Sequence, residues 1–155
     1  MFERPEYLNQ LIKFKDTDFI KVITGVRRSG KSVLLMLFQE HLIKEGVPDD
    51  HIIYMNFESF EYQTITTEEK FREKLNELLP KDTKKIYLLF DEIQVVEGWQ
   101  RVINGIRVSF DSDIVITGSN ANMLSGELAT LLSGRYIEIP IYPFSFQEFL
   151  NVKGI

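Results

Sequence analysis

The segment GVRRSGKS, at positions 25–32, constrains the fold of this chain more than any other feature. It matches the pattern G-x-x-x-x-G-K-S/T and follows an apolar run typical of a strand, FIKVIT. An apolar run typical of a helix, SVLLMLFQEHLIKEG, begins at its last residue. Glycines let the backbone curl so that successive N–H groups point inward at phosphate oxygens, and the helix adds the positive end of its dipole. A strand, this loop and a helix in succession therefore predict a phosphate-binding loop.

Two residues at the end of this loop have predicted tasks at a nucleotide. Lys31 can reach the β and γ phosphates, and the Ser32 hydroxyl can hold a magnesium ion that bridges them. Arg27 and Arg28 occupy positions where the backbone does the binding. They act either at the nucleotide or a partner surface, or they are solvated and pair with nearby acids. The nucleotide-binding residues predicted from this loop are Gly25, Val26, Arg27, Arg28, Ser29, Gly30, Lys31, Ser32 and Val33.

Short runs rich in Ile, Val, Tyr and Phe predict five strands, at 19–24, 51–57, 85–90, 113–118 and 135–140. Helical patterns lie between them, at 32–46, 66–80 and 98–110. Strands that alternate with helices imply a mainly parallel sheet covered on both faces. The sequence therefore predicts an α/β fold with three layers and a five-stranded sheet.

The ends and faces of these helices also carry signals. Gly46 predicts a C-cap for the first helix, and a capping box from Thr66 to Glu69 predicts the start of the second, which stops at Pro80. In the third helix, one apolar face holds Trp99, Val102, Ile103, Ile106 and Phe110.

Composition narrows the classes of protein that fit. A chain of 155 residues with 44% apolar residues suits a single domain, and the net charge of −5 argues against a surface that grips nucleic acid throughout. Without cysteine, neither disulfides nor a thiolate zinc site can form, and His41 and His51 lack metal-ligand spacing. The charged N-terminus does not suit a signal peptide, and no apolar run approaches the roughly 20 residues that span a bilayer. We expect a cytoplasmic protein with no membrane partner.

Residues 85–94, KIYLLFDEIQ, form a buried-type strand that ends in two adjacent carboxylates. An acid at the C-terminal end of a core strand needs a partner, and Mg²⁺ supplies one. Asp91 would hold the ion with Ser32, directly or through water, while Glu92 would polarise the attacking water. Paired acids of this kind are typical of ATPases, whereas GTPases read guanine with an N-K-x-D segment that this sequence lacks. The sequence therefore favours ATP and magnesium, with Lys31 and Glu92 as catalytic residues.

Two later segments hold further candidates. The strand DIVITG is followed by Ser119 and Asn120, which either sense the γ-phosphate or act as a helix N-cap. Arg135, in SGRYIEI, lies at a helix-to-strand junction. It is either an arginine finger that neutralises transition-state charge, in cis or in trans, or part of a surface ion pair.

The segments GVRRSGKS, LLFDEIQ, a tryptophan soon after it, ITGSNANML, LLSGRY and PFSFQEFL occur in this order. With them, nearly the whole chain resembles a prokaryotic AAA-type ATPase family in which a C-terminal domain of unknown function follows the ATPase module. The resemblance implies a RecA-like, AAA-type P-loop core with the phosphate-loop strand near the sheet centre, and ATP and magnesium as ligands. It also implies that Ser119 and Asn120 lie on the sensor segment and Arg135 on the family's G-R pair.

The family's second domain has no match in this chain. We expect residues 1–140 to form the ATPase domain and residues 141–155 to begin a linker or helix toward a C-terminal domain. Ser145 and Glu148 form a capping box there, and the helix would carry on one face Phe146, Phe149 and Leu150. That face would contact the next domain or fold back onto the ATPase core.

We therefore expect an ATPase module that drives or switches an attached domain. Two alternatives stay open, a small-molecule phosphotransferase that uses the same loop and a nucleotide-dependent binding module with negligible turnover. Assembly into a homo-oligomer and binding of nucleic acid stay open as well, although the net charge does not support the second.

Overall fold

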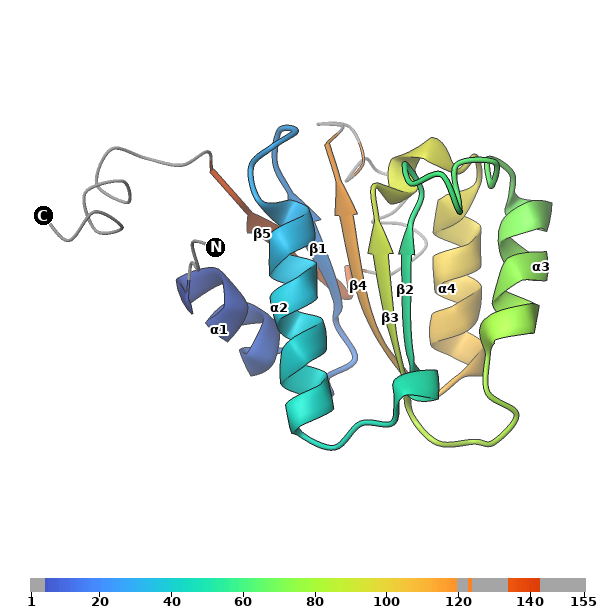
Figure 1. Ribbon diagram of the computed structural model, residues 1–155, viewed down its shortest axis with the longest axis horizontal. Helices are drawn as coiled ribbons and strands as arrows, with labels where there is room; N and C mark the ends of the chain where they lie inside the picture. The colour runs from blue at the N-terminus through green and yellow to red at the C-terminus, as the bar shows by residue number, and fades with distance from the viewer. Residues whose placement is uncertain (1–4, 120–122, 124–133, 143–155) are drawn as a thin grey trace, which may run out of the picture.

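One parallel sheet forms the centre of the molecule (Figure 1). The computed structural model describes residues 5–119, 123 and 134–142. The five strands follow the order β2-β3-β4-β1-β5, and each neighbouring pair is parallel. Their bounds are β1 Ile20–Thr24, β2 Ile52–Asn56, β3 Ile86–Asp91, β4 Ser112–Gly118 and β5 Tyr136–Pro140. The predicted sheet is confirmed, and β1, which leads into the phosphate loop, lies next to the central strand β4.

Helices cover both faces of the sheet. In Figure 1, two helices lie on one side of the sheet, α1 (Pro5–Lys13) and α2 (Lys31–Lys44). On the other side lie α3 (Glu68–Leu78) and α4 (Trp99–Ser109). Two short 3₁₀ turns, η1 (Asp49–His51) and η2 (Ile93–Val95), complete the described elements. The three layers are those of a P-loop α/β fold, as predicted; α1 was not foreseen from the sequence.

Alternation along the strands produces two apolar cores. In β1, Val22 packs into the core beneath α3 and α4, whereas its neighbour Ile23 packs into the core beneath α1 and α2. Leu88 and Leu89 in β3 divide in the same way. A pleated strand sends successive side chains to opposite faces, so a strand covered on both sides reads as a continuous apolar run. This pattern made the strands visible in the sequence, and each predicted end lies within one residue of the observed one.

The helix ends and faces follow the predictions with three corrections. Helix α2 ends at Lys44 with Glu45 as its C-cap, one residue before the predicted Gly46, which follows with φ of 92° and donates its amide to Ile43 O. The cap of α3 is Thr67 instead of Thr66: its hydroxyl accepts from Lys70 N at 3.3 Å, while the carbonyl of Thr66 accepts from Glu97 N in the loop between η2 and α4. Phe110 follows the end of α4 and is 46% exposed, so it does not join the buried face of that helix.

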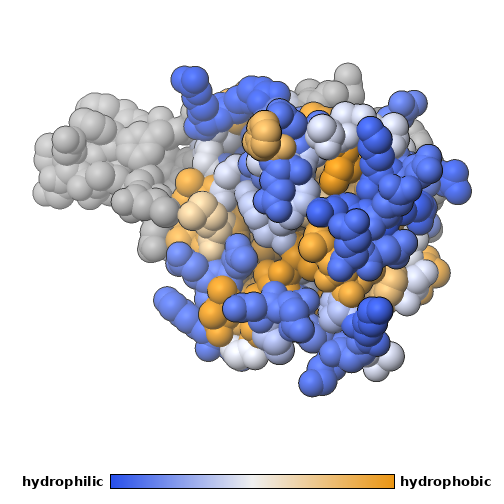
Figure 2. Space-filling model, turned by 45° about the vertical axis from the view of Figure 1, so that its right-hand side comes forward, coloured by the Kyte–Doolittle hydropathy of each residue, from blue (hydrophilic) through white to orange (hydrophobic). Residues whose placement is uncertain are grey.

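The surface is mostly polar on the face drawn in Figure 2, with apolar residues exposed between charged side chains. Among the described residues, the most exposed large apolar side chain is that of Phe60, in the loop between β2 and α3. No helix in the described part of the chain is both long and apolar enough to cross a membrane.

The N-terminal edge of the sheet contains a buried ion pair. Lys21 in β1 contacts Asp113 in β4, and both side chains are fully buried. Burial lowers the pKa of Lys21, and the Asp113 carboxylate opposes part of that shift. Lys21 also donates to the carbonyls of Phe14 and Phe19, and Asp113 accepts from the amide of Asp16. These contacts fix the connection between α1 and β1 to the sheet.

A second polar cluster joins two loops through His51. Its Nδ1 lies 2.7 Å from Asp50 Oδ1, and its Nε2 lies 2.9 Å from Asp82 Oδ1. Hydrogen bonds to Asp82 and Asp50 raise the pKa of His51 above its ordinary value of 6.5. The charged ring therefore connects η1 to the loop that follows α3.

The stability of the fold should depend on pH through this histidine. Because the folded-state pKa of His51 is raised, its contribution is fully present below 6.5 and is lost as pH rises through the folded-state value. His51→Gln should therefore lower the free energy of unfolding more at about pH 6 than at about pH 9, measured by urea denaturation. His41→Gln, on α2, is the control. Equal losses at both pH values would contradict a role for the charge of the His51 ring.

Candidate functional site

The parallel strands all end at the same edge of the sheet, and the phosphate loop leaves β1 at this edge. A pocket of about 540 Å³ lies there. Side chains from three parts of the chain line it: the loop with the start of α2, the segment after β2, and the end of β3. The lining residues are Arg27, Arg28, Gly30, Lys31, Ser32, Val33, Asn56, Glu58 and Glu92. The structure therefore brings together residues that are up to 65 positions apart in the sequence.

The loop has the backbone of an anion cradle. Gly30 adopts φ of 102°, which side-chain-bearing residues rarely adopt, and a Cβ there would meet nothing within 4 Å. At Gly25 the constraint is space, because a Cβ would lie 2.7 Å from the carbonyl oxygen of Ile141. Helix α2 begins at Lys31, and its N-cap residue Gly30 has no side chain that could cap the first turn. Its N–H groups therefore suit an anion, and the loop fits a phosphate group.

Lys31 is buried at the centre of the site. Its ammonium donates to the carbonyls of Gly25 at 2.8 Å and Val26 at 3.0 Å, and to Ser119 Oγ at 3.1 Å. It also lies 3.3 Å from Glu92 Oε1. The two predicted catalytic residues are thus in contact, and the sensor candidate Ser119 joins them.

Asp91 connects three elements at the end of β3. Its carboxylate is fully buried. Oδ2 accepts from Ser32 Oγ at 2.6 Å and from Tyr54 OH at 3.0 Å, while Oδ1 accepts from Thr117 Oγ1 at 2.6 Å. Burial and the nearby Asp91 charge raise the pKa of Tyr54, so its hydroxyl stays protonated as a donor. A hydroxyl and a carboxylate oxygen in contact fit Mg²⁺, which takes one or two carboxylates and completes its shell with water and phosphate oxygens.

Glu92 follows in a left-handed backbone conformation, with φ of 55°. Its amide donates to Thr117 Oγ1 at 2.9 Å, and its carboxylate accepts from Gln94 Nε2 and Ser119 Oγ at 2.7 Å each. Burial by itself raises the pKa of Glu92, but the hydrogen bonds from Gln94 and Ser119 and the charge of Lys31 outweigh it. The net result is a pKa below the ordinary value of 4.5, so this carboxylate is ionised at neutral pH.

The two loop arginines differ in their surroundings. Arg27 makes a two-pronged contact with Glu58, with Nη–Oε distances of 2.8 and 2.6 Å. Glu58 comes from the loop after β2, so the pair crosses one side of the pocket. Arg28 lines the pocket and carries a positive φ of 67°. The ion pair expected as one alternative for these arginines is thus observed at Arg27.

Arg135 lies at the opposite edge of the sheet. Its carbonyl accepts from the amide of Ile20 at the start of β1, and its guanidinium contacts Asp18 at 2.7 Å. The length of β1 separates it from the phosphate loop, five residues or roughly 16 Å at about 3.3 Å per residue. Within this chain, therefore, Arg135 does not reach Lys31. Asn120, the other sensor candidate, lies outside the described residues.

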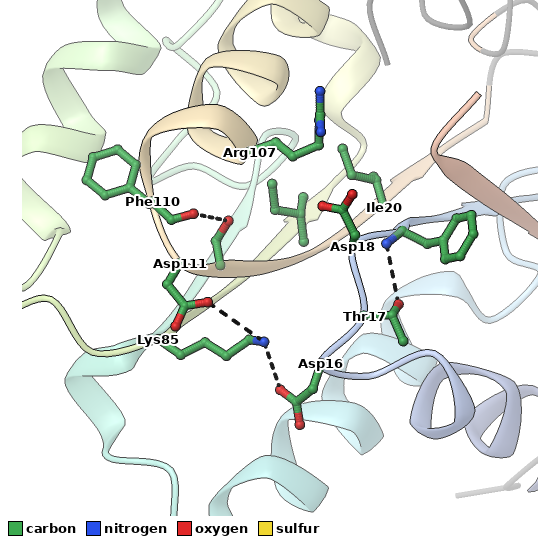
Figure 3. Close-up of a pocket in the computed structure, with 11 residues that line it drawn as sticks. Asp16, Thr17, Asp18, Ile20, Lys85, Arg107, Phe110 and Asp111 are labelled. Carbon is green, nitrogen blue, oxygen red and sulfur yellow. Dashed lines mark hydrogen bonds and ion pairs between the residues drawn. The ribbon is translucent and has the colours of Figure 1, made fainter. Parts of the chain in front are cut away.

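A second pocket, of about 250 Å³, lies at this opposite edge, beside Asp18. Figure 3 shows Lys85 between Asp16 and Asp111, with Arg107 and Asp18 on the other side of the pocket. The lining carries both acidic and basic side chains, so its charge favours neither an anionic nor a cationic ligand.

Sequence reasoning missed three residues that hold the two acids. Tyr54 and Thr117 come near the ends of β2 and β4, the strands on either side of β3, and both bind Asp91. Gln94 binds Glu92 two residues further along the chain. Polar residues near the ends of core strands were the available signal for Tyr54 and Thr117, but the sequence does not state which strands are neighbours.

Thr117 offers a direct test of this network. Thr117→Val keeps the shape of the side chain but removes the donor to Asp91 Oδ1 and the acceptor for Glu92 N, leaving both buried groups unpaired. We expect a loss of about 1–3 kcal/mol in the free energy of unfolding, measured by urea denaturation. Thr83→Val, at an exposed loop position, is the matched control. A Thr117→Val protein as stable as the parent would show that other donors hold Asp91.

A family model described as "AAA domain" matches residues 17–150. An uncharacterized protein of Haemophilus influenzae is 62% identical over 155 residues, which are the whole of this chain and 39% of that protein. The chain thus spans less than half the length of this relative.

Solved structures share the fold at low sequence identity. A DNA polymerase III gamma subunit-related protein of Thermotoga maritima has a TM-score of 0.63 at 13% identity, covering 97% of this chain and 49% of that one. AMPPCP-bound DnaA of Aquifex aeolicus also has a TM-score of 0.63, at 16% identity, covering 95% of this chain and 48% of that one. The likeness at these identities concerns the fold, whereas the family match covers most of the sequence. With its phosphate loop, its paired acids and this match, the chain belongs to the AAA domain family of P-loop ATPases.

Proposed function

We propose that this chain binds ATP with magnesium and hydrolyses it to ADP and phosphate. The observation that carries the proposal is the contact of four side chains at one edge of the sheet. Ser32 touches Asp91 at 2.6 Å, and Lys31 lies 3.3 Å from Glu92. One pair offers oxygen ligands for a metal ion, and the other offers a cation for phosphate beside a carboxylate for water.

Each residue has a separate role in this proposal. Lys31 exchanges its contacts with loop carbonyls for contacts with β and γ phosphate oxygens. Ser32 and Asp91 hold the magnesium ion, which neutralises charge that develops on the phosphates. Glu92 accepts a proton from the attacking water. At the same time the water oxygen bonds to the γ-phosphorus, and the bond between the γ-phosphorus and the ADP oxygen breaks. Ser119, which contacts both Lys31 and Glu92, senses the γ-phosphate.

The charge arrangement supports a coupling between binding and hydrolysis. In this structure, the ammonium of Lys31 lies beside the carboxylate of Glu92 and helps to keep its pKa low. A carboxylate that is engaged with an ammonium is a weaker base. When Lys31 turns to the phosphates, Glu92 loses this cation and becomes the stronger base. We therefore propose that nucleotide binding itself activates Glu92.

ATP is the proposed nucleotide, because the paired acids are typical of ATPases and the sequence contains no N-K-x-D segment. The DnaA structure of similar fold carries AMPPCP, an analogue of ATP, which supports the same choice. We further propose that hydrolysis drives or switches an attached domain, in keeping with the greater length of the Haemophilus influenzae relative. The expected helix that begins at Ser145 lies outside the described residues and stays a prediction.

Two substitutions test the proposal. Lys31→Ala should abolish ATP binding in calorimetry while the circular dichroism spectrum remains that of the folded parent, because a phosphate ligand is lost from a preformed loop.

Glu92→Gln should bind ATP but lose about 100-fold or more in turnover, the usual scale for a lost general base.

Other outcomes would favour the alternatives. Unchanged ATP affinity in Lys31→Ala would contradict the assignment of this loop as the nucleotide site. Parent-like hydrolysis by Glu92→Gln would mean that another residue is the base. Phosphate transfer that requires a small acceptor would indicate a phosphotransferase, and tight ATP binding without phosphate release would indicate a binding module.

Arg135 could act in hydrolysis only at the nucleotide bound to a second subunit. It is exposed, and it lies at the edge of the sheet that is remote from the phosphate loop of its own chain. We propose that Arg135 replaces its contact with Asp18 by a contact with the γ-phosphate bound to a neighbouring copy. The active assembly would then be a homo-oligomer.

A mixing experiment checks this arrangement. Specific ATPase activity should rise with protein concentration, because the site is completed by association. Arg135→Ala and Lys31→Ala proteins, each inactive alone, should recover some activity when mixed, since each supplies the residue that the other lacks. Activity that is independent of concentration, with no recovery on mixing, would contradict a finger in trans.

A further inference from the structure

Three residues hold the side chain of Glu92. Lys31 lies 3.3 Å from Oε1, and Ser119 Oγ lies 2.7 Å from Oε1 and 2.9 Å from Oε2. Gln94 Nε2 donates to Oε2 at 2.7 Å. A general base works only when its oxygen is within hydrogen-bond reach of the proton that it takes. The residues that hold the Glu92 carboxylate in place therefore also set the position of the proposed base.

Two of these three partners have other tasks in the proposed function. Lys31 binds phosphate oxygens, and Ser119 senses the γ-phosphate. Gln94 does not line the phosphate pocket. Among the described residues, it is the one hydrogen-bond partner of the Glu92 side chain that has no proposed task at the phosphates. Gln94 can therefore hold Glu92 before and after nucleotide binds.

The local backbone brings Gln94 to Glu92. The left-handed conformation of Glu92, with φ of 55°, turns the chain sharply at the end of β3. The 3₁₀ turn η2 follows at once and returns the chain, so two side chains at positions i and i+2 meet. A non-glycine residue in this conformation is strained, and the strain persists where the surrounding structure enforces it. Here it is enforced in part by the bond from Glu92 N to Thr117.

The orientation of the Gln94 amide is set by the carboxylate. An ionised carboxylate only accepts hydrogen bonds, so the amide nitrogen must face Glu92. The amide oxygen is buried, and no partner for it lies among the described residues. This oxygen therefore plays no part in choosing the orientation. The amide nitrogen of Gln94 thus bonds to Glu92, while its buried oxygen has no hydrogen-bond partner among the described residues.

Gly118 provides the space for this arrangement. It ends β4, the neighbour of β3, and a Cβ built there would meet the Met123 side chain first and would then lie 2.9 Å from Gln94 Oε1. Real Cβ atoms essentially never come so close to another heavy atom. A larger residue at this position would crowd the side chains of Met123 and Gln94, so the small size of Gly118 leaves room for the Gln94 amide.

We propose that Gln94 is a positioning residue for hydrolysis, because its amide holds Oε2 of Glu92 and leaves Oε1 turned toward Lys31 and the phosphate pocket. The proposal presupposes the general-base role of Glu92 in the proposed function. It assigns Gln94 no contact with nucleotide or metal. Losing the Gln94 amide should therefore affect the chemical step and leave nucleotide binding unchanged.

Gln94→Met keeps the length of the side chain and removes the donor. We expect the affinity for ATP in calorimetry to match that of the parent, while kcat falls about 10-fold, the scale of a hydrogen bond to a charged group. Gln100→Met, on α4 and likewise partly buried, is the matched control and should keep the parent kcat. Urea denaturation and circular dichroism establish that each variant is folded. A Gln94→Met protein with the parent kcat, or with weakened ATP binding and unchanged kcat, would overturn the proposal.

A double-mutant cycle separates positioning from a general structural role. In Glu92→Gln, the carboxylate that Gln94 holds is absent, so adding Gln94→Met should cause little further loss of single-turnover rate. A second cycle combines Gln94→Met with Glu92→Ala, which removes the acceptor oxygen that the Gln substitution keeps. The effects of these two substitutions on the unfolding equilibrium constants, measured without added nucleotide, should also be non-additive, because the contact does not depend on ATP. Additive effects in both measurements would overturn the proposal.

The cycle also distinguishes this inference from the proposed function. A large loss in Glu92→Gln with no loss in Gln94→Met would overturn the role of Gln94 alone. Parent-like turnover in Glu92→Gln would contradict the role of Glu92 as the base, and it would also overturn the role of Gln94, which depends on it.

Discussion

A single buried carboxylate holds the site together. Asp91 accepts hydrogen bonds from Ser32 at the start of α2, from Tyr54 in β2 and from Thr117 in β4. Burying a charge is costly unless hydrogen bonds satisfy it, so these donors stabilise the folded state. The same donors bring the phosphate loop to the end of β3. The requirement to satisfy one buried acid therefore also assembles the proposed metal site.

The next residue, Glu92, balances the charge of Lys31. Each of the two is buried, and an unpaired buried charge would be unfavourable, so their contact stabilises the site as it stands. In the proposed function a nucleotide competes for Lys31, and the contact with Glu92 is then given up. Gln94 and Thr117 hold the acid through its side chain and its backbone, so the proposed base would keep its place when the ammonium leaves.

The parallel sheet gives its two edges different characters. The C-terminal ends of the strands carry the phosphate loop and the two acids, as open parallel sheets place ligands beyond these ends. The N-terminal edge carries the buried pair of Lys21 and Asp113, with Arg135 exposed nearby. An arginine at this edge can serve a phosphate only across a subunit boundary. The direction of the strands therefore connects the proposed role of Arg135 to assembly.

The sequence alone determined the five strands, the helices α2 to α4, the phosphate loop and the acids, because glycine spacing, apolar runs and adjacent carboxylates are local patterns. It could not determine that Tyr54 and Thr117 flank Asp91, or that Arg135 lies far from Lys31. Those facts follow from the strand order β2-β3-β4-β1-β5, which brings distant segments side by side. Local periodicity contains no information on which strands pair. Only the tertiary structure decided which side chains meet at Asp91 and Glu92, because their hydrogen bonds join residues up to 59 positions apart.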